Sequence, residues 1–274
     1  MRITKAIILV AGWGTRRLPV TKVIEKCMLP VGNRPLIDFV VEDCQKAGIS
    51  DIFFVVSQPH SQIEDYYSRN DSLERYLRAA RKEQFLPSVT PPPLHFHYIV
   101  QDNGGKYGTA VPVSLALPYL EPDESVVVLT GDDFIYNVDG TSETARLITA
   151  AGANCALLGA RVQRSQTGNY GVLDYDKNHN FIRIVERPAP AEAPSTLINV
   201  SKYVLNYQAL QLIRDYTQTE RDSEYYIIDP INQYVAAGGV MKILPIHGRY
   251  CDGGNTMSWL KANEFVINNM MQGK

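Results

Sequence analysis

A chain of 274 residues has room for one large α/β domain or two small ones, and we expect a single domain over residues 1–274. Its 27 Lys and Arg residues and 29 Asp and Glu residues give a net charge of −2, and the basic residues are dispersed. This excludes the extended basic surface typical of proteins that bind nucleic acid or an anionic membrane.

No apolar segment reaches bilayer length, and the chain opens on a strand without a leader, so we expect a cytoplasmic protein. The four cysteines lack CxxC spacing, which argues against a zinc site or disulfides.

An apolar run at residues 6–11 predicts a buried strand that ends in a glycine-containing turn. Gly12 and Gly14 lack a Cβ, so the backbone there can approach an anion closely and direct its N–H groups at it. Arg16 and Lys26 follow within the same loop and can supply the positive charges that a triphosphate requires. The segment therefore predicts a polyphosphate-binding loop.

Two common glycine-rich motifs do not fit this loop. The dinucleotide-binding fingerprint needs a third glycine three residues after the second, and that position is Arg17. A Walker-type loop needs Gly-Lys-Ser or Gly-Lys-Thr after four intervening residues, and the chain contains no such string. We therefore expect neither hydride transfer with a dinucleotide nor a P-loop.

Strands and helices alternate through the first half, which predicts an α/β fold with a parallel sheet covered on both faces. Ligands are expected in the crevice beyond the carboxyl ends of its strands. The segment 63–85 is rich in charged residues and tyrosine, and it predicts one or two surface helices closed by the prolines at 91–93. The other elements expected in this half are a helix over 36–47 that stops at Gly48, strands over 52–56, 96–100 and 125–130, and a helix over 109–117.

The second half has a more mixed pattern. Asp229 is expected to cap the helix that follows it, with Pro230 in the first turn. The other elements expected here are a helix over 142–151, strands over 155–160, 171–175 and 181–185, a strand ending at 205, a helix over 207–216, a strand over 241–245 and a closing helix over 255–269.

The opening loop carries a recognisable signature. Residues 11–19 read Ala-Gly-Trp-Gly-Thr-Arg-Arg-Leu-Pro, Thr21-Lys22 follows, and residues 26–30 read Lys-Cys-Met-Leu-Pro. This order resembles the signature of the sugar-1-phosphate nucleotidylyltransferases. The Thr-Lys form is similar to that of the bacterial UTP:glucose-1-phosphate uridylyltransferase family within them.

The helical segment 63–85 also favours that family, because the shorter thymidylyltransferases lack a matching insertion. The resemblance implies a three-layer Rossmann-like nucleotidyltransferase fold with a central, mostly parallel mixed sheet. It further implies a nucleotide-binding half over about 1–140 and a sugar-binding half over about 141–274.

The resemblance also implies which residues bind the nucleotide. Arg16 and Lys26 are expected to be catalytic, stabilising the triphosphate and the departing pyrophosphate. The amide of Gln101 offers a donor and an acceptor, which fit the N3–H and O4 edge shared by uracil and thymine. The nucleotide-binding positions expected in this way are Ala11, Gly12, Gly14, Thr15, Gln101 and Gly108.

Two acids are expected to bind Mg²⁺. Asp132 directly follows the apolar strand at 125–130, which places it at the ligand-binding end of the sheet. Asp252 matches the Asp-x-Gly-Asn string of the family. Magnesium usually takes one or two carboxylates together with substrate phosphates, so two acids suffice. Asp133 is expected to cap or to act indirectly.

The sugar side shows the resemblance with some departures. Tyr-Gly-Val at 170–172 and Glu-Arg-Pro at 186–188 resemble the Tyr-Gly-Val and Glu-Lys-Pro strings of the family, with Arg187 in place of lysine. Ser201 and Lys202 stand where the family has glycine and arginine. These departures leave the identity of the sugar open. The sugar-phosphate-binding positions implied are Gly171, Glu186, Arg187, Val200 and Lys202.

The implied activity joins UTP and glucose-1-phosphate to give a nucleotide-sugar and pyrophosphate, with Mg²⁺ as the cofactor. The resemblance also implies a homodimer or homotetramer that binds neither nucleic acid nor membrane. Three alternatives stay open: a thymidylyltransferase, a transferase for another sugar-1-phosphate, and a non-catalytic regulatory subunit that binds a nucleotide-sugar. The last of these should have lost a charged residue of the loop or a metal acid, whereas Arg16, Lys26, Asp132 and Asp252 are all present.

Overall fold

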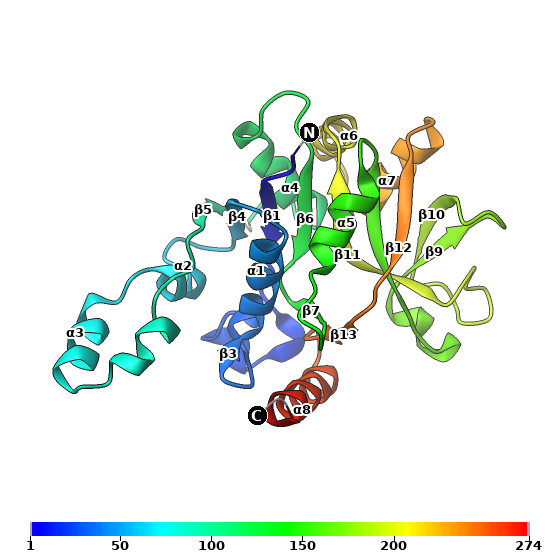
Figure 1. Cartoon of the computed structure of the whole chain (residues 1–274). Helices are drawn as coiled ribbons and strands as arrows, with labels where there is room; N and C mark the ends of the chain where they lie inside the picture. The colour runs from blue at the N-terminus through cyan, green and yellow to red at the C-terminus, as the bar shows by residue number, and fades with distance from the viewer. Residues whose placement is uncertain (1, 103, 273–274) are drawn as a thin grey trace.

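A computed structural model describes residues 2–102 and 104–272 and shows a nine-stranded sheet between helices (Figure 1). The strand order is β10-β9-β11-β6-β1-β4-β5, and β8 pairs with both β11 and β12. The pairs among β6, β1, β4 and β5 and the pair β8–β12 are parallel, whereas β9, β10 and β11 pair antiparallel, so the predicted mostly parallel mixed sheet is confirmed. The strands are β1 (Lys5–Leu9), β4 (Asp51–Val56), β5 (His95–Val100), β6 (Val126–Thr130), β8 (Cys155–Arg161), β9 (Gly171–Tyr175), β10 (Phe181–Glu186), β11 (Leu197–Leu205) and β12 (Met241–Pro245).

The middle of the sheet has the burial expected of a parallel strand covered on both faces. Ala6, Ile7 and Ile8 of β1 are fully buried. Leu9 pairs with Val55 on one side and with Thr130 on the other, so β1, β4 and β6 end level with one another. The loops that follow these three strands therefore open at one edge of the sheet.

Helices cover the two faces and complete three layers (Figure 1). One hydrophobic core contains buried residues of α1, α5 and α8, and the other contains those of α4, α6 and α7. The predicted three-layer arrangement is confirmed. The helices are α1 (Leu36–Lys46), α4 (Ala110–Ala116), α5 (Glu143–Ala151), α6 (Tyr207–Gln218), α7 (Ile228–Ala236) and α8 (Thr256–Gln272).

The insertion between β4 and β5 forms two short helices, α2 (Gln62–Tyr67) and α3 (Asp71–Ala79), followed by the 3-10 segment η4 (Glu83–Ser88). They project to one side of the sheet (Figure 1), as the prediction of surface helices required. Further 3-10 turns are η1 (Thr15–Arg17), η2 (Val20–Lys22), η3 (Lys26–Met28), η5 (Leu117–Tyr119) and η6 (Arg164–Asn169).

Sequence patterns missed two short two-stranded sheets. One pairs β2 (Pro30–Val31) with β3 (Arg34–Pro35), and the other pairs β13 (Arg249–Asp252) with β7 (Asp133–Tyr136) in antiparallel register. The second sheet joins segments more than a hundred residues apart, so no local pattern predicts it.

The predicted cap at Asp229 is wrong. Helix α7 starts earlier, with Ile227 as its cap residue, because the backbone N–H of Ile227 donates to the hydroxyl of Thr109 at 2.9 Å. Asp229 instead lies in the first turn and accepts a hydrogen bond from the hydroxyl of Tyr216. A contact with a distant helix therefore set the boundary.

Other expectations agree with the structure. All four cysteines are buried and unpaired. Within 2–102 and 104–272, no helix combines the length and hydropathy needed to cross a bilayer. The large sheet contains strands from both predicted halves, and the boundary near residue 140 stays a prediction.

Candidate functional site

The predicted polyphosphate-binding loop folds back on itself. Gly14 has a positive φ of 64°, which a glycine adopts without strain, and a Cβ there would lie 3.0 Å from Thr21 and 3.2 Å from Lys26. The hydroxyl of Thr21 donates to the carbonyl of Gly14 at 2.9 Å. At Gly12 the space that a Cβ would occupy is open, which suits the approach of an anion. The fold of the loop thus brings Lys26 back beside the glycine turn.

The insertion holds the same loop from outside. The backbone N–H of Glu25 donates to the side chain of Gln62 at 2.8 Å, and the backbone N–H of Gln62 donates to the carboxylate of Glu25 at 2.6 Å. Glu25 directly precedes Lys26, so these hydrogen bonds with α2 help to fix the position of the backbone at Lys26. Burial raises the pKa of Glu25.

Lys26 contacts the first candidate metal acid. Its ammonium donates to a carboxylate oxygen of Asp132. Burial by itself would raise the pKa of Asp132, but the charge and the hydrogen bond of Lys26, with a further contribution from Lys202, outweigh it and lower that pKa. Asp132 is therefore held as a carboxylate at neutral pH.

The second candidate acid reaches the same place through the sheet formed by β7 and β13. Asp133 lies opposite Asp252 in that sheet, and the backbone N–H of Gly253 donates to the carbonyl of Asp132 at 3.0 Å. Asp132, directly before β7, and Asp252, at the end of β13, thus lie on adjoining segments. The N–H of Gly254 donates to Asp252 at 2.6 Å and fixes that carboxylate.

Arg16 also reaches this region. A Cβ on Gly254 would lie 3.7 Å from Nη2 of Arg16 and 2.7 Å from the carboxylate of Asp252. The structure therefore gathers the two cations predicted to bind the triphosphate, Arg16 and Lys26, and the two acids predicted to bind the metal, Asp132 and Asp252.

The donor set fits a hard divalent cation that is shared with a substrate. Among residues 2–102 and 104–272, no group of three or more His, Cys, Asp or Glu side chains is arranged as a metal site. Two carboxylates match the way Mg²⁺ binds, because its other coordination positions are filled by water and substrate phosphate. Asp132 and Asp252 would hold such an ion.

Gln101, the residue expected to bind the base, lies beside Trp13 of the glycine-containing loop. Gln101 is buried at the end of β5 and lines a cavity of about 570 Å³ together with Trp13 and Asp102. Trp13 was not predicted as a site residue, although a tryptophan between the two glycines of this loop is a signal in the sequence. The structure leaves its indole 60% exposed.

Gly108 has a packing role that the sequence did not reveal. Its φ is 120°, and a Cβ there would lie 2.5 Å from the carbonyl oxygen and 2.6 Å from the nitrogen of Tyr225. Only glycine allows this backbone approach. Contact of Gly108 with a base stays a prediction.

The predicted sugar side is formed where β9 and β10 pair. Gly171 lies opposite Glu186, and a Cβ on Gly171 would be 3.0 Å from a carboxylate oxygen of Glu186. Burial raises the pKa of Glu186 against the opposing charge of Arg187, whose Nε lies 3.3 Å from the carboxylate. Gly171, Glu186 and Arg187 are thus adjacent, and their role in binding the sugar stays a prediction.

The segment of β11 that was expected to bind sugar is irregular. Its register with β8 shifts between Asn199 and Tyr203, and Ser201 has a φ of 51° within this shift. Val200 and Lys202 are buried. The ammonium of Lys202 points to the end of β6, where it donates to the carbonyl of Thr130 at 2.9 Å. Its described contacts are therefore with the protein near Asp132 and Asp133.

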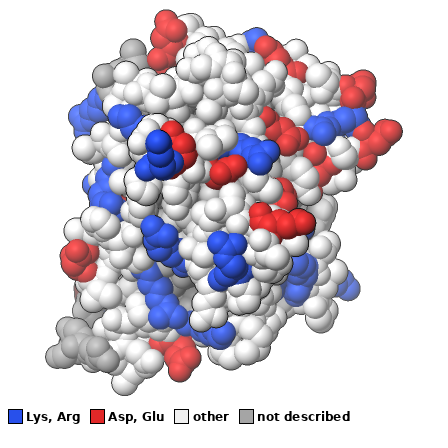
Figure 2. Space-filling view, turned by 90° about the vertical axis from the view of Figure 1, so that its right-hand side faces the viewer, with Lys and Arg blue, Asp and Glu red and all other residues white. Residues whose placement is uncertain are grey.

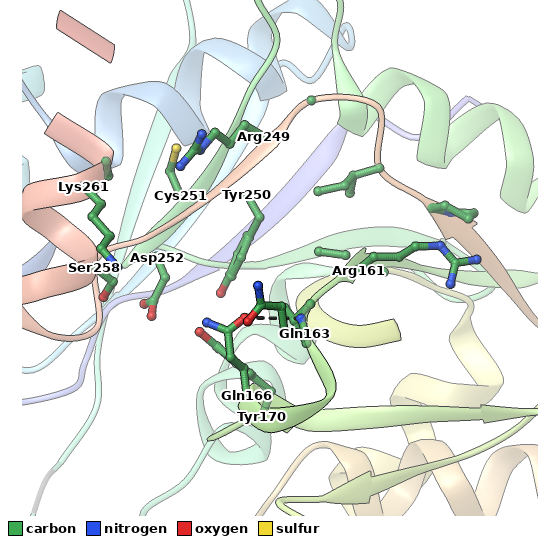
Figure 3. A pocket seen from close by; sticks show the side chains of 17 residues that line it. Arg161, Gln163, Gln166, Tyr170, Arg249, Tyr250, Cys251, Asp252, Ser258 and Lys261 are labelled. Atoms are coloured by element: carbon green, nitrogen blue, oxygen red, sulfur yellow. Dashed lines mark hydrogen bonds between the residues drawn. The ribbon is translucent and has the colours of Figure 1, made fainter. Parts of the chain in front are cut away.

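A cavity of about 840 Å³ adjoins Asp252 (Figure 3). Asp252 and Tyr250 project from the same side of β13 toward Gln163, Gln166 and Tyr170 of the loop before β9 (Figure 3). Burial, followed by the charge of Asp252, raises the pKa of Tyr170. Tyr250 carried no signal in the sequence, because it acts through a strand pairing that was not predicted.

The face turned toward the viewer in Figure 2 is the side of the molecule on which β9 and β10 lie in Figure 1. Acidic and basic residues both occur across this face. The mixture on this face agrees with the near-neutral composition.

Comparison with known proteins decides the family. A family model described as nucleotidyl transferase matches residues 5–269. The chain belongs to the nucleotidyl transferase family. A UTP–glucose-1-phosphate uridylyltransferase of Pseudomonas aeruginosa is 30% identical over 276 residues, which cover 98% of this nucleotidyl transferase and 97% of the relative. The UTP–glucose-1-phosphate uridylyltransferase 2 of Streptococcus pyogenes is 33% identical over 224 residues, 77% of this nucleotidyl transferase and 73% of the relative.

Solved structures agree. The UTP-bound UGPase from Acinetobacter baumannii matches this nucleotidyl transferase with a TM-score of 0.85 at 26% identity, over 96% of this chain and 93% of that one. The resemblance drawn from the loop signature is confirmed over nearly the whole chain, and so is the expected fold.

Proposed function

We propose that this nucleotidyl transferase joins UTP and glucose-1-phosphate, giving UDP-glucose and pyrophosphate. The names of its relatives support the reaction, and one observation in the structure carries it: Arg16, Lys26, Asp132 and Asp252 converge beside an open glycine turn. This set has the charges that a nucleotide triphosphate and a divalent cation need. A non-catalytic subunit would have no reason to keep all four.

The reaction requires one displacement. A phosphate oxygen of the sugar phosphate forms a bond to the α-phosphorus of the nucleotide, and the bond from that phosphorus to the bridging oxygen breaks, so pyrophosphate leaves on the opposite side. A phosphate monoester is already an anion at neutral pH, so no general base is needed. The protein acts by positioning and by electrostatic stabilisation.

The charged residues have separate tasks in this scheme. Asp132 and Asp252 would hold the proposed Mg²⁺, which when bound screens the repulsion between the two anionic substrates. Lys26 and Arg16 bind the triphosphate and neutralise the charge that develops on pyrophosphate. The glycine turn supplies backbone N–H groups to the same phosphates.

Base and sugar are assigned to two separate groups of residues. The amide of Gln101 pairs with the N3–H and O4 edge of uracil inside the cavity that it shares with Trp13. Glu186 accepts hydrogen bonds from sugar hydroxyls above Gly171, and Arg187 binds the incoming phosphate. Roles for Ala11, Thr15 and Val200, the homodimer or homotetramer, and the cytoplasmic location stay predictions.

The test is a pyrophosphate-release screen of the purified protein with Mg²⁺. UTP, dTTP and CTP are each paired with the 1-phosphates of glucose, galactose, mannose and N-acetylglucosamine. We expect UTP with glucose-1-phosphate to rank first, and CTP to be poorer by about ten- to a hundredfold because its edge mismatches a buried amide. Another pair that ranks tenfold above it would replace the proposed substrates. Asp252→Asn should lose at least about a hundredfold in turnover without losing its fold.

A further inference from the structure

A buried polar cluster lies directly behind the two candidate metal acids. Asp133, at the start of β7, has little exposure, and both of its carboxylate oxygens are engaged. Oδ1 accepts from the hydroxyl of Thr130 at 2.8 Å and from the ammonium of Lys202, and Oδ2 accepts from the hydroxyl of Tyr250 at 2.7 Å. Both carboxylate oxygens of Asp133 therefore accept hydrogen bonds from other side chains of the protein.

The partners come from three separate strands. Thr130 ends β6, Lys202 lies on β11 and Tyr250 lies on β13. Lys202 is only 4% exposed and also donates to the carbonyl and the hydroxyl of Thr130, at 2.9 and 3.1 Å. A buried ammonium and a buried carboxylate are tolerated here because each has both an opposite charge and hydrogen bonds.

This cluster controls a sheet that is too small to be rigid alone. The sheet of β7 and β13 has four residue pairs, and isolated two-stranded sheets are marginally stable. Asp252 lies opposite Asp133, and Tyr250 lies two residues before Asp252, so the three side chains share one face. Figure 3 shows Asp252 and Tyr250 directed to the same side of β13.

We propose that Asp133, Lys202 and Tyr250 are positioning residues that set the separation and direction of the carboxylates of Asp132 and Asp252. The bond from Tyr250 ties β13 to β7, and the bonds from Lys202 tie the start of β7 to the large sheet. Asp132 directly precedes Asp133 and therefore moves with it. The inference rests on the proposed function in taking Asp132 and Asp252 as metal acids, and it replaces the sugar contact expected for Lys202.

Metal binding tests this directly. Binding of Mn²⁺ is followed through the loss of the EPR signal of the free ion, with and without UTP, in Asp133→Asn, Tyr250→Phe and the wild type. We expect both variants to bind Mn²⁺ about 10- to 100-fold more weakly, the usual effect of losing a residue that orients a metal ligand. In the pyrophosphate-release assay kcat should fall by a similar factor, while KM for glucose-1-phosphate changes little.

Matched variants separate positioning from general stability. Tyr136→Phe removes a hydroxyl from the same small sheet and should leave Mn²⁺ binding unchanged. Lys202→Arg keeps the charge and should retain far more Mn²⁺ affinity than Lys202→Met. All variants are compared well below their Tm, with near-UV circular dichroism to confirm the fold.

Three results would overturn the inference. Unchanged Mn²⁺ affinity and kcat with a lowered Tm would make the cluster a scaffold only. Tighter Mn²⁺ binding in Tyr250→Phe would show that Asp133 is itself a metal ligand. A wild type that binds no Mn²⁺ in either condition would leave no acids to position. If Mn²⁺ affinities change as expected but no UTP and sugar phosphate pair releases pyrophosphate, the proposed function fails and the positioning inference stands.

Discussion

The ammonium of Lys26 and the carboxylate of Asp132 are in direct contact in the structure, although they are 106 positions apart in the sequence. The proposed reaction needs Lys26 on the triphosphate and Asp132 on the metal. Each residue must therefore exchange its partner when substrate and metal bind. The lysine thus balances a charge that the proposed metal would balance in the complex with substrate.

Lys26→Met should separate these two effects. We expect kcat to fall by at least about a hundredfold, because a transition-state contact is lost. The nucleotide-free variant should nevertheless bind Mn²⁺ more tightly than the wild type at pH 8, since no ammonium competes for Asp132. Lys46→Met, on the surface of α1, is the control. Weaker Mn²⁺ binding in Lys26→Met would mean that the contact with Asp132 assists metal binding.

Removal of Lys26 also changes the pH dependence of that site. The pKa of Asp132 is lowered because Lys26 outweighs burial, so without Lys26 burial acts with less opposition and the pKa rises. The Mn²⁺ affinity of Lys26→Met should then fall at a higher pH than that of the wild type as the solution is acidified. Equal profiles would show that the charge of Lys26 does not reach Asp132 in solution.

Trp13 should report on nucleotide binding. The chain has two tryptophans, and Trp13 shares its cavity with Gln101 whereas Trp259 lies against Arg17. UTP is expected to quench the fluorescence of the wild type and of Trp259→Phe, but not of Trp13→Phe. Trp13→Ala should raise KM for UTP by about tenfold, the scale of one base–aromatic contact, with KM for glucose-1-phosphate little changed. Quenching that survives in Trp13→Phe would place the base elsewhere.

We expect the carboxylate of Glu186 to lower the stability of the folded protein at neutral pH while it contributes to substrate binding. Its pKa is raised above the ordinary 4.5, so between 4.5 and the folded value the folded protein binds more protons than the unfolded one. Stability therefore falls as pH rises through that window, and the loss remains at neutral pH. Glu186→Gln lacks this loss and should have a higher Tm at pH 8, with the gain disappearing as pH approaches 4.5. Its KM for glucose-1-phosphate should rise by about tenfold because a charged acceptor is lost. A Tm difference that does not change with pH would remove titration of Glu186 as the cause.

Ser201 has a positive φ, a backbone conformation that favours glycine, and glycine is the residue of the resembled family at this position. The φ of 51° at Ser201 destabilises a residue with a side chain by roughly 1–2 kcal/mol, and glycine removes this strain. Glycine also increases the entropy of the unfolded chain, which lowers the stability by up to about 1 kcal/mol and so offsets part of the gain. Ser201→Gly should therefore raise the free energy of unfolding by up to about 1 kcal/mol in urea titrations. Ser72→Gly, inside α3, should lower it by about the same amount. A loss of stability in Ser201→Gly would mean that the serine is stabilised by contacts that outweigh its backbone conformation.

Local sequence determined much of this protein. The apolar run of β1, the glycine turn and the position of Asp132 after a buried strand are short-range features, and each was confirmed in place. The order of strands and helices fixed the layered fold for the same reason, since periodicity is set within a few residues. Gly171 and Glu186, which the resemblance assigned to the sugar side, lie opposite each other because they belong to neighbouring strands.

The tertiary structure decided the rest. Asp133 meets Tyr250 and Asp252 through a sheet of four residue pairs whose strands are separated by more than a hundred residues, and such short strands carry no periodic signal. Lys202 contacts Asp133 because β11 pairs with β6, and this pairing depends on the tertiary arrangement of the sheet. Asp229 does not cap α7, whose cap residue Ile227 instead donates its backbone N–H to the hydroxyl of Thr109, and a glycine is required at position 108 by the backbone of Tyr225. In each case a non-local contact outweighed or added to a local preference, and such contacts exist only once the chain is folded.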